Sequence, residues 1–321
     1  TVQVIPHVTD EIKNRIHLVN AQNNYDVIIC EVGGTVGDIE SLPFMESIRQ
    51  LSLEVGYHNH MIVHVTLLPF VKASGELKSK PTQHSVMKLR EIGLSPDMIL
   101  CRSEFPIEQS VRDKIALFCN VPSNHVIEGR DVSSIYEVPL AIYRQNAGQL
   151  IKDRLKIKKT PQLGTLKKFI KNYKNPKHEV TIAMCGKYTE LIDSYKSVME
   201  AFVHAGVENN ARVNIKWIQT EKIKNLEDVE KVYSNINGVL ILPGFGSRGS
   251  EGKIKIVKYS RENKIPFLGI CLGLQCAVIE FARNVCKMKG ANSTEFNSKT
   301  QYPVIDLMES QRAIKIKGGT M

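Results

Sequence analysis

The chain has 321 residues, 42% of them hydrophobic, and a formal net charge of +10 at neutral pH. This length allows two domains of ordinary size, and no apolar run approaches the roughly 20 residues of a membrane-spanning helix. Seven cysteines, odd in number and without a C-x-x-C pair, argue against a disulfide framework or a zinc site. We therefore expect a cytoplasmic protein with no secretory signal and no membrane partner.

The positive charge is concentrated in one stretch. Between Lys152 and Lys177 ten lysines or arginines stand against a single acid, Asp153. The first part, Lys152–Pro161, has no interleaved aromatic residues and no nucleic-acid-binding motif. A solvated linker is therefore favoured over a nucleic-acid site. The position of this basic stretch predicts a first domain over residues 1–160, a basic linker over 161–178 and a second domain over 179–321.

The first expected element of the first domain is the run Asp26–Glu31. Its β-branched apolar residues predict a buried parallel strand, and the glycine-rich loop that follows lies where open α/β sheets place ligands. Glu31, Asp38 and Glu40 crowd this loop. They are either solvated acids of a turn or the ligands of a hard cation such as magnesium.

Strands and helices then alternate through the rest of the first domain. Strands are expected at 60–69, 97–102 and 125–128, and helices at 44–55, 81–92 and 110–119. This alternation predicts a parallel, doubly wound sheet. Lys78 and Lys80 precede the N-terminus of the helix that Pro81 opens, where ammonium groups and free N–H groups can bind an anion. The alternative is a capped surface helix.

The same pattern restarts in the second domain. Strands are expected at 180–185, 213–218 and 238–242, and helices at 194–205 and 252–263, which predicts a second doubly wound α/β domain.

The most informative stretch follows these elements. A short apolar strand from Pro266 leads through Gly269-x-Cys271-x-Gly273 into a helix over 275–282. Glycines two residues on either side permit a sharp strand-to-helix turn that holds the central residue strained and exposed. The helix N-terminus favours the thiolate, and the next backbone N–H can donate to an oxyanion. An ordinary buried cysteine is the alternative.

Seven motifs, in chain order, resemble those of the CTP synthase family over essentially the whole chain. They are Glu31-Val-Gly-Gly-Thr-Val-Gly-Asp-Ile-Glu-Ser41, Lys78-Ser-Lys-Pro-Thr-Gln83, Asp131-Val-Ser-Ser-Ile-Tyr136, Gly186-Lys-Tyr-Thr-Glu190, Gly244-Phe-Gly-Ser-Arg-Gly-Ser-Glu-Gly252, Gly269-Ile-Cys-Leu-Gly273 and Ala291-Asn-Ser-Thr-Glu-Phe296. The cysteine motif alone would indicate only a class I glutamine amidotransferase; the first two motifs make the resemblance specific.

The resemblance implies a ligase that forms a C–N bond in pyrimidine nucleotide synthesis. An amidoligase domain would phosphorylate UTP with ATP and Mg²⁺, and ammonia from glutamine would then displace the phosphate to give CTP. CTP would be a feedback inhibitor and GTP an allosteric activator acting near Arg248. The resemblance also implies a homotetramer that can form filaments.

It further implies a role for individual residues. Cys271 would attack the glutamine amide, with oxyanion donors near Gly244 and Leu272, and Glu31 would be a magnesium ligand. Glutamine would be held by Gly244, Leu272, Gly273, Leu274, Gln275 and Glu295. UTP or CTP would be held by Asp38, Ile39, Glu40, Lys78, Ser79, Lys80, Pro81, Thr82, Gln83 and Lys114. ATP would lie against Arg130, Asp131 and Val132.

The chain departs from the family pattern in four places. Pro243 replaces a glycine beside the oxyanion loop and removes one N–H group, and Leu274 replaces a methionine of similar volume. No G-x-x-x-x-G-K-[ST] loop occurs, and no histidine follows Cys271.

The last two departures predict an internal fragment of a CTP synthase. Both of its domains would be truncated, without the phosphate loop and the glutaminase His/Glu pair, and it would be inactive alone. The alternative is a non-catalytic piece that joins synthase tetramers or filaments. A stand-alone glutaminase leaves the first two motifs unexplained.

Overall fold

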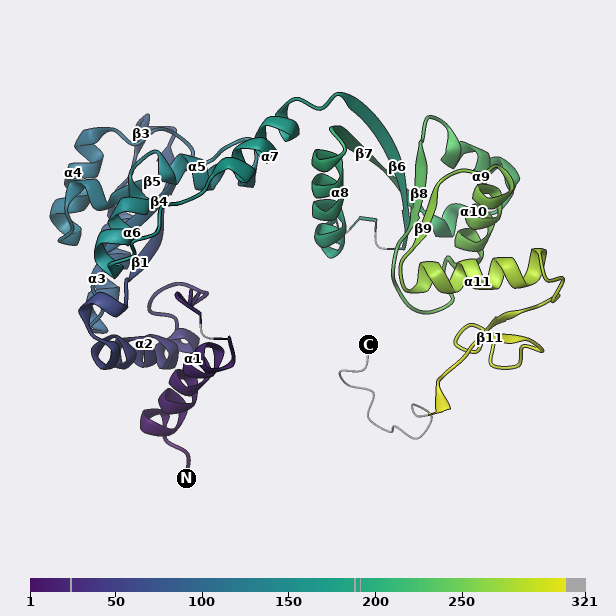
Figure 1. Ribbon diagram of the computed structural model, residues 1–321. Helices are drawn as coiled ribbons and strands as arrows, with labels where there is room; N and C mark the ends of the chain where they lie inside the picture. The colour runs from purple at the N-terminus through teal and green to yellow at the C-terminus, as the bar shows by residue number, and fades with distance from the viewer. Residues whose placement is uncertain (24, 188, 191, 310–321) are drawn as a thin grey trace. The chain divides into compact units, whose positions relative to one another are not determined.

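The computed structural model describes residues 1–23, 25–187, 189–190 and 192–309. The chain forms two compact units, Thr1–Leu163 and Gly164–Met321, each with its own parallel sheet (Figure 1). Within the described residues, no helix is both long and apolar enough to cross a membrane.

The stretch predicted as a basic linker is mostly helical. Helix α7 (Gly164–Lys174) occupies most of residues 161–178, and only residues 156–163 form an irregular connection. The helix is amphipathic: Ile170 is buried, and the Phe169 ring lies 5.3 Å from that of His204 in the same unit. Lysines dominate the composition of this stretch, whereas its few apolar side chains determine that it packs.

The first unit contains a three-stranded parallel sheet in the order β1-β4-β5, and a short antiparallel hairpin, β2-β3. The strands are β1 (Val63–Leu68), β2 (Phe70–Val71), β3 (Glu76–Leu77), β4 (Met98–Ser103) and β5 (Val126–Arg130). The helices are α1 (Thr9–Asn23), α2 (Leu42–Val55), α3 (Lys80–Glu91), α4 (Gln109–Cys119), α5 (Val138–Tyr143) and α6 (Ala147–Leu155).

Apolar side chains pack against both faces of the central strand, β4. On one face Ile99 and Cys101 of β4 pack with Val86 of α3 and Ile115 of α4. On the other, Met98 and Ile127 pack with Ala147 of α6. Alternate side chains of β4 thus pack into two separate cores, one on each face of the sheet. This confirms the doubly wound architecture predicted for this unit.

The strand predicted at Asp26–Glu31 is wrong for this structure. These residues have no regular secondary structure, and Ile29 is 91% exposed. A strand requires a hydrogen-bonded neighbour, and in the described part of the unit the sheet pairs only β1, β4 and β5. The apolar run therefore remains unpaired, and Glu31 is exposed rather than partly buried.

The second unit contains a four-stranded parallel sheet in the order β7-β6-β8-β9. Its strands are β6 (His178–Gly186), β7 (Ala211–Gln219), β8 (Gly238–Ile241) and β9 (Phe267–Gly269), with a small separate pair, β10 (Asn292–Ser293) and β11 (Pro303–Ile305). Besides α7, its helices are α8 (Lys196–Glu208), α9 (Leu226–Tyr233), α10 (Ser250–Glu262) and α11 (Leu272–Asn284).

Helices cover both faces of this second sheet (Figure 1). Val198 and Phe202 of α8 pack against Met184 and Leu240 on one face. Val229 of α9 and Ile256 of α10 pack with Cys185 and Ile241 on the other. Helix α11 packs on α10 through Ile254, Leu272, Cys276 and Ile279. The second predicted doubly wound domain is confirmed.

Candidate functional site

Cys271 lies at the turn between β9 and α11. It is exposed, and its backbone has φ 52° and ψ −109°, a region that residues with a side chain rarely adopt. Backbone strain at an exposed nucleophile is typical of functional sites. Leu272 begins α11, where the first N–H groups have no partner inside the helix and can bind an anion.

The two glycines around Cys271 are required by close contacts. A Cβ on Gly269 would lie 2.5 Å from the carbonyl carbon of Gly273. A Cβ on Gly273 would lie 2.3 Å from the carbonyl oxygen of Ile241. Both neighbours are backbone atoms, one of helix α11 and one of strand β8, so only glycine allows the turn to close this tightly.

A second loop follows β8 next to this turn. The Ile270 N–H donates to the Ile241 carbonyl at 3.1 Å, which places the cysteine turn beside the end of β8. In the loop, the Gly246 N–H donates to Glu295 Oε1 at 2.6 Å, and Lys187 Nζ donates to the Phe245 carbonyl at 3.2 Å. The loop after β8 is therefore held by Glu295 and Lys187, and β8 itself is joined to the cysteine turn through Ile241.

The predicted glutamine residues are distributed around this junction. Leu272 and Gly273 are buried in the turn, Gln275 is half-buried and Leu274 is 59% exposed. Leu272 Cδ2 lies 3.6 Å from where a Cβ on Gly244 would be. Lys187 belongs to a motif quoted above, but its contact with the Gly244–Gly246 loop was not predicted. Tyr188 of that motif lies outside the described residues.

Burial distinguishes Cys271 from most of the other cysteines. Cys101, Cys119, Cys185 and Cys276 are buried, and desolvation raises the pKa of Cys101, Cys119 and Cys276 to about 11 and that of Cys185 further. Cys30 is exposed, although partial desolvation raises the pKa of its thiol too. Near neutral pH the buried cysteines are therefore thiols and poor nucleophiles.

In the first unit, two of the lysines predicted to hold a triphosphate come together. Lys78 forms an ion pair with Glu76, and this contact, with a smaller contribution from Lys114 of α4, lowers the pKa of the Glu76 carboxyl. Lys80 is the first residue of α3, where free backbone N–H groups add positive potential. A positive site is formed here, with Glu76 as its present counter-ion.

Three other residues of this motif have internal partners. Thr82 Oγ1 donates to Thr66 Oγ1 at 2.9 Å, and Gln83 Nε2 donates to Ser79 Oγ at 3.0 Å. All three motif residues are buried, whereas Pro81 is exposed. In this conformation Ser79, Thr82 and Gln83 support the helix N-terminus, while Lys78 and Lys80 are its accessible cations.

The predicted ATP residues follow β5. Arg130 is the last residue of that strand and is exposed. The Asp131 N–H donates to the Ser103 carbonyl at the end of β4, and its carboxylate accepts from Arg102 Nε at 3.1 Å. Val132 is half-buried. This places all three at the carboxyl ends of the parallel strands, where α/β sheets bind ligands.

The carboxylates predicted to bind magnesium are not gathered. Asp38 Oδ2 accepts the Thr35 N–H at 2.9 Å, which closes the glycine-rich loop on itself. Glu31, Asp38 and Glu40 are all exposed, and the described residues contain no group of three acidic, histidine or cysteine side chains that could hold a metal ion. The described residues therefore form no magnesium cage made of protein ligands alone, and a site that nucleotide phosphates complete beside Glu31 stays a prediction.

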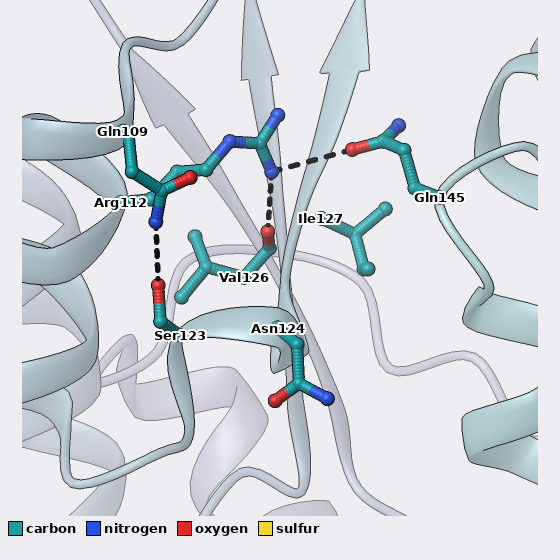
Figure 2. A pocket seen from close by; sticks show the side chains of 7 residues that line it. All are labelled: Gln109, Arg112, Ser123, Asn124, Val126, Ile127 and Gln145. Atoms are coloured by element: carbon teal, nitrogen blue, oxygen red, sulfur yellow. Dashed lines mark hydrogen bonds between the residues drawn. The ribbon is translucent and has the colours of Figure 1, made fainter.

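Two surface pockets lie away from these residues. One, of about 360 Å³, is lined by Gln109, Arg112, Ser123, Asn124, Val126, Ile127 and Gln145 (Figure 2). There Arg112 donates to the Val126 carbonyl at 2.7 Å and to Gln145 Oε1 at 3.3 Å, so its guanidinium already has internal acceptors. The other, of about 440 Å³, borders β7 and α9. Neither is lined by a predicted ligand residue.

Comparisons with known proteins point to one family. A model described as CTP synthase N-terminus matches residues 1–157, and one described as glutamine amidotransferase class-I matches residues 190–311. A CTP synthase of Caldanaerobacter subterraneus subsp. tengcongensis is 55% identical, and one of Methanocaldococcus jannaschii is 53% identical. Each alignment covers 100% of this chain and 60% of the relative.

A solved structure described as the Trypanosoma brucei CTPS glutaminase domain with bound acivicin is 36% identical, with a TM-score of 0.39 over 41% of this chain and 52% of that one. The chain thus spans about three fifths of the length of its curated relatives. Its two sheets, the cysteine turn and both family models agree: the chain belongs to the CTP synthase family and carries a CTP synthase N-terminal domain followed by a class I glutamine amidotransferase domain.

Proposed function

We propose that this chain contributes to the ATP-dependent amination of UTP to CTP, with ammonia released from glutamine. Cys271 would attack the glutamine amide in the second unit. The positive site of Lys78, Lys80 and Lys114 would bind the triphosphate of UTP or CTP in the first. Family membership supports the overall reaction, and the geometry of the two units supports these roles.

The turn at Cys271 carries this proposal. An exposed thiol with a positive φ stands at a helix N-terminus, and the loop that contains Gly244, to which Glu295 is hydrogen-bonded, follows β8 next to this turn. These are the parts that an acyl transfer needs: a nucleophile, backbone donors for the oxyanion, and a carboxylate able to receive the substrate amino group.

Acivicin, an electrophile that mimics glutamine, tests the role of Cys271. We expect it to label Cys271 ahead of the other two exposed cysteines, Cys30 and Cys286, and Cys271→Ser to abolish that labelling. Peptide mass spectrometry identifies the site. Equal labelling of the three exposed cysteines would contradict a glutamine site at Cys271.

Glutamine hydrolysis by the 321-residue chain should remain at background. Acyl transfer needs a group that gives a proton to the departing amide nitrogen and then, as a base, takes one from the attacking water, and no histidine follows Cys271. His204, the nearest histidine before it in sequence, packs against Phe169 of α7. Ammonia release above that of Cys271→Ser, measured by a coupled dehydrogenase assay, would show that another base serves the site.

The ligands of the whole enzyme belong to the same proposal. Family membership and the motifs support four further ligands: magnesium, ATP, CTP and GTP. ATP would be bound by Arg130, Asp131 and Val132, CTP by Asp38, Ile39 and Glu40, and GTP near Arg248. Arg248 now pairs with Glu221 at 3.2 Å. Titration calorimetry with CTP and Mg²⁺ tests the nucleotide part, for which we expect weak binding at most.

The alternative role, a non-catalytic piece that joins synthase oligomers, has one observation in its favour. The outer face of β1 leaves Val63, Val65 and Leu67 exposed. Light scattering of the chain distinguishes the two readings, because a non-associating monomer would count against an assembly role.

A further inference from the structure

Lys253 of α10 is completely buried although it carries a charge. It is 0% exposed and is among the largest fully buried side chains of the chain. Within the described residues no carboxylate pairs with it, and its recorded partner is the Leu242 carbonyl, 3.1 Å from Nζ. Burying an ammonium costs several kcal/mol unless other groups compensate, so a structural role alone would be met better by an apolar residue.

The position of Lys253 adds to this cost. It lies in the first turn of α10, where the helix dipole disfavours a cation. Burial lowers the pKa of its ammonium. Lys253 Nζ and Leu272 Cδ2 lie 3.9 and 3.6 Å from where a Cβ on Gly244 would be. The ammonium therefore lies close to the residue that follows Cys271.

The Leu242 carbonyl, which accepts the hydrogen bond from Lys253, lies where β8 ends and the loop begins. Leu242 comes directly after β8, beyond the last residue that pairs with β9. Its carbonyl precedes Pro243 and the Gly244–Gly246 loop. Lys253 Nζ lies 3.9 Å from where a Cβ on Gly244 would be, so it bonds the start of the peptide segment that leads into the loop and lies beside its end.

We propose that Lys253 is a positioning residue of the glutaminase site: its buried ammonium holds the Leu242 carbonyl and thereby fixes the Leu242–Gly246 loop against Cys271. This inference rests on the function proposed for Cys271. Pro243 has no N–H and Gly244 no side chain, so this loop has few bonds of its own. Glu295 and Lys187 hold it at Gly246 and Phe245, and Lys253 holds it at its start.

Lys253→Met tests the proposal because it keeps all but the last atom of the side chain's length and removes the charge and donors. The matched control is Lys255→Met, which removes an exposed lysine of the same helix that also donates to a backbone carbonyl, that of Lys224 at 2.6 Å. The first measurement is hydrogen exchange of peptides covering Leu242–Arg248. We expect exchange at least tenfold faster in Lys253→Met and unchanged in Lys255→Met.

The second measurement compares two reagents at Cys271. Iodoacetamide is small and reacts with any exposed thiol, whereas acivicin must also bind against the Leu242–Gly246 loop before it reacts. We expect acivicin labelling of Cys271 to fall at least tenfold in Lys253→Met, with iodoacetamide labelling within twofold of the wild type and both reactions unchanged in Lys255→Met. The buried Cys185 and Cys276 should stay unlabelled.

Three outcomes would contradict the inference. Unchanged loop exchange in Lys253→Met would show that the ammonium does not hold the loop. Labelling of Cys185 or Cys276 in that variant would mean that Lys253 maintains the fold of the whole unit. Faster exchange with unchanged acivicin labelling would mean that the loop does not serve the glutamine site. A wild type that acivicin does not label would instead contradict the proposed function, while the exchange experiment would still report on the loop.

Discussion

Cys271 combines two properties that mutation can separate. Its thiol is exposed for chemistry, and its backbone adopts a positive φ that costs about 1–3 kcal/mol for a residue with a Cβ. The sheet, the two flanking glycines and the packing of Leu272 into the core of α10 and α11 impose this conformation. The turn thus stores strain where the nucleophile is needed.

Cys271→Gly should therefore stabilise the second unit while removing the nucleophile. Relative to Cys271→Ala, which retains the Cβ, we expect its free energy of unfolding to rise by about 1 kcal/mol, because relief of strain exceeds the entropy cost of glycine. Urea unfolding followed by the fluorescence of Trp217, the only tryptophan and a residue of β7, measures this. A glycine variant less stable than the alanine variant would contradict the strain.

His64 of β1 should make the first unit sensitive to pH. It is 8% exposed, bonds Ser85 Oγ at 2.8 Å, and burial lowers its pKa. The unfolded chain binds a proton near pH 6.5, whereas the folded chain does so only at lower pH. The contribution of His64 to the free energy of unfolding is therefore fully present above pH 6.5 and is lost progressively as the pH falls below it toward the pKa of the folded state.

We expect the protection of β4 amides against hydrogen exchange to decrease between pH 7.5 and 5.5, after correction for intrinsic rates. His64→Gln should flatten this dependence. His84→Gln, which changes an exposed histidine of α3, should leave it unchanged. Equal pH dependence in wild type and His64→Gln would exclude His64 as the cause.

At the scale of elements, two ion pairs join α10 and α11: Arg283 pairs with the exposed Glu251 at 3.0 Å, and Arg261 pairs with a buried glutamate. Arg261 of α10 donates through Nη2 to Glu280 Oε1 of α11 at 2.8 Å and through Nε to Oε2 at 3.0 Å. Glu280 is 1% exposed. A carboxylate this deeply buried depends on its partner for compensation, and the pairing orients α11 on α10.

Arg261→Met should destabilise the second unit by about 3–5 kcal/mol, since it leaves the buried Glu280 carboxylate unpaired. The control is Arg212→Met, which breaks an exposed pair with Glu179 in the same unit and should cost less than about 1 kcal/mol. Both are measured by urea unfolding with Trp217 fluorescence. Equal effects would show that burial does not decide the contribution of the pair.

At the scale of the whole molecule, the two units are joined by residues 156–163. This segment has no regular structure and is largely exposed, and it contains Lys158 and Lys159. Limited trypsin digestion should therefore cut there first and yield two fragments that resist further cleavage, each with a folded core of its own. First cuts inside α7, at Lys167 or Lys168, would show that this helix is not packed in solution.

Most strands and helices of this protein, and the turn at Cys271, could be predicted from the sequence because each depends on residues close together in the chain. Hydrophobic periodicity predicted β1, β4, β5, β6, β7 and β8 and most of the helices that cover them, since each element buries one face. The spacing Gly269-x-Cys271-x-Gly273 predicted the strained turn, because those glycines act within five residues of chain. The motifs pointed to the family in the same way.

Other features depended on contacts between distant residues, and only the tertiary structure decided them. Asp26–Glu31 has the pattern of a strand but no strand beside it, and α7 packs although lysines dominate its sequence. Lys78 and Lys114 are brought to one carboxylate by separate elements, and a lysine 18 residues before Cys271 lies buried against the Leu242 carbonyl. Pairing, burial and charge proximity are properties of neighbours in space, which no local pattern records.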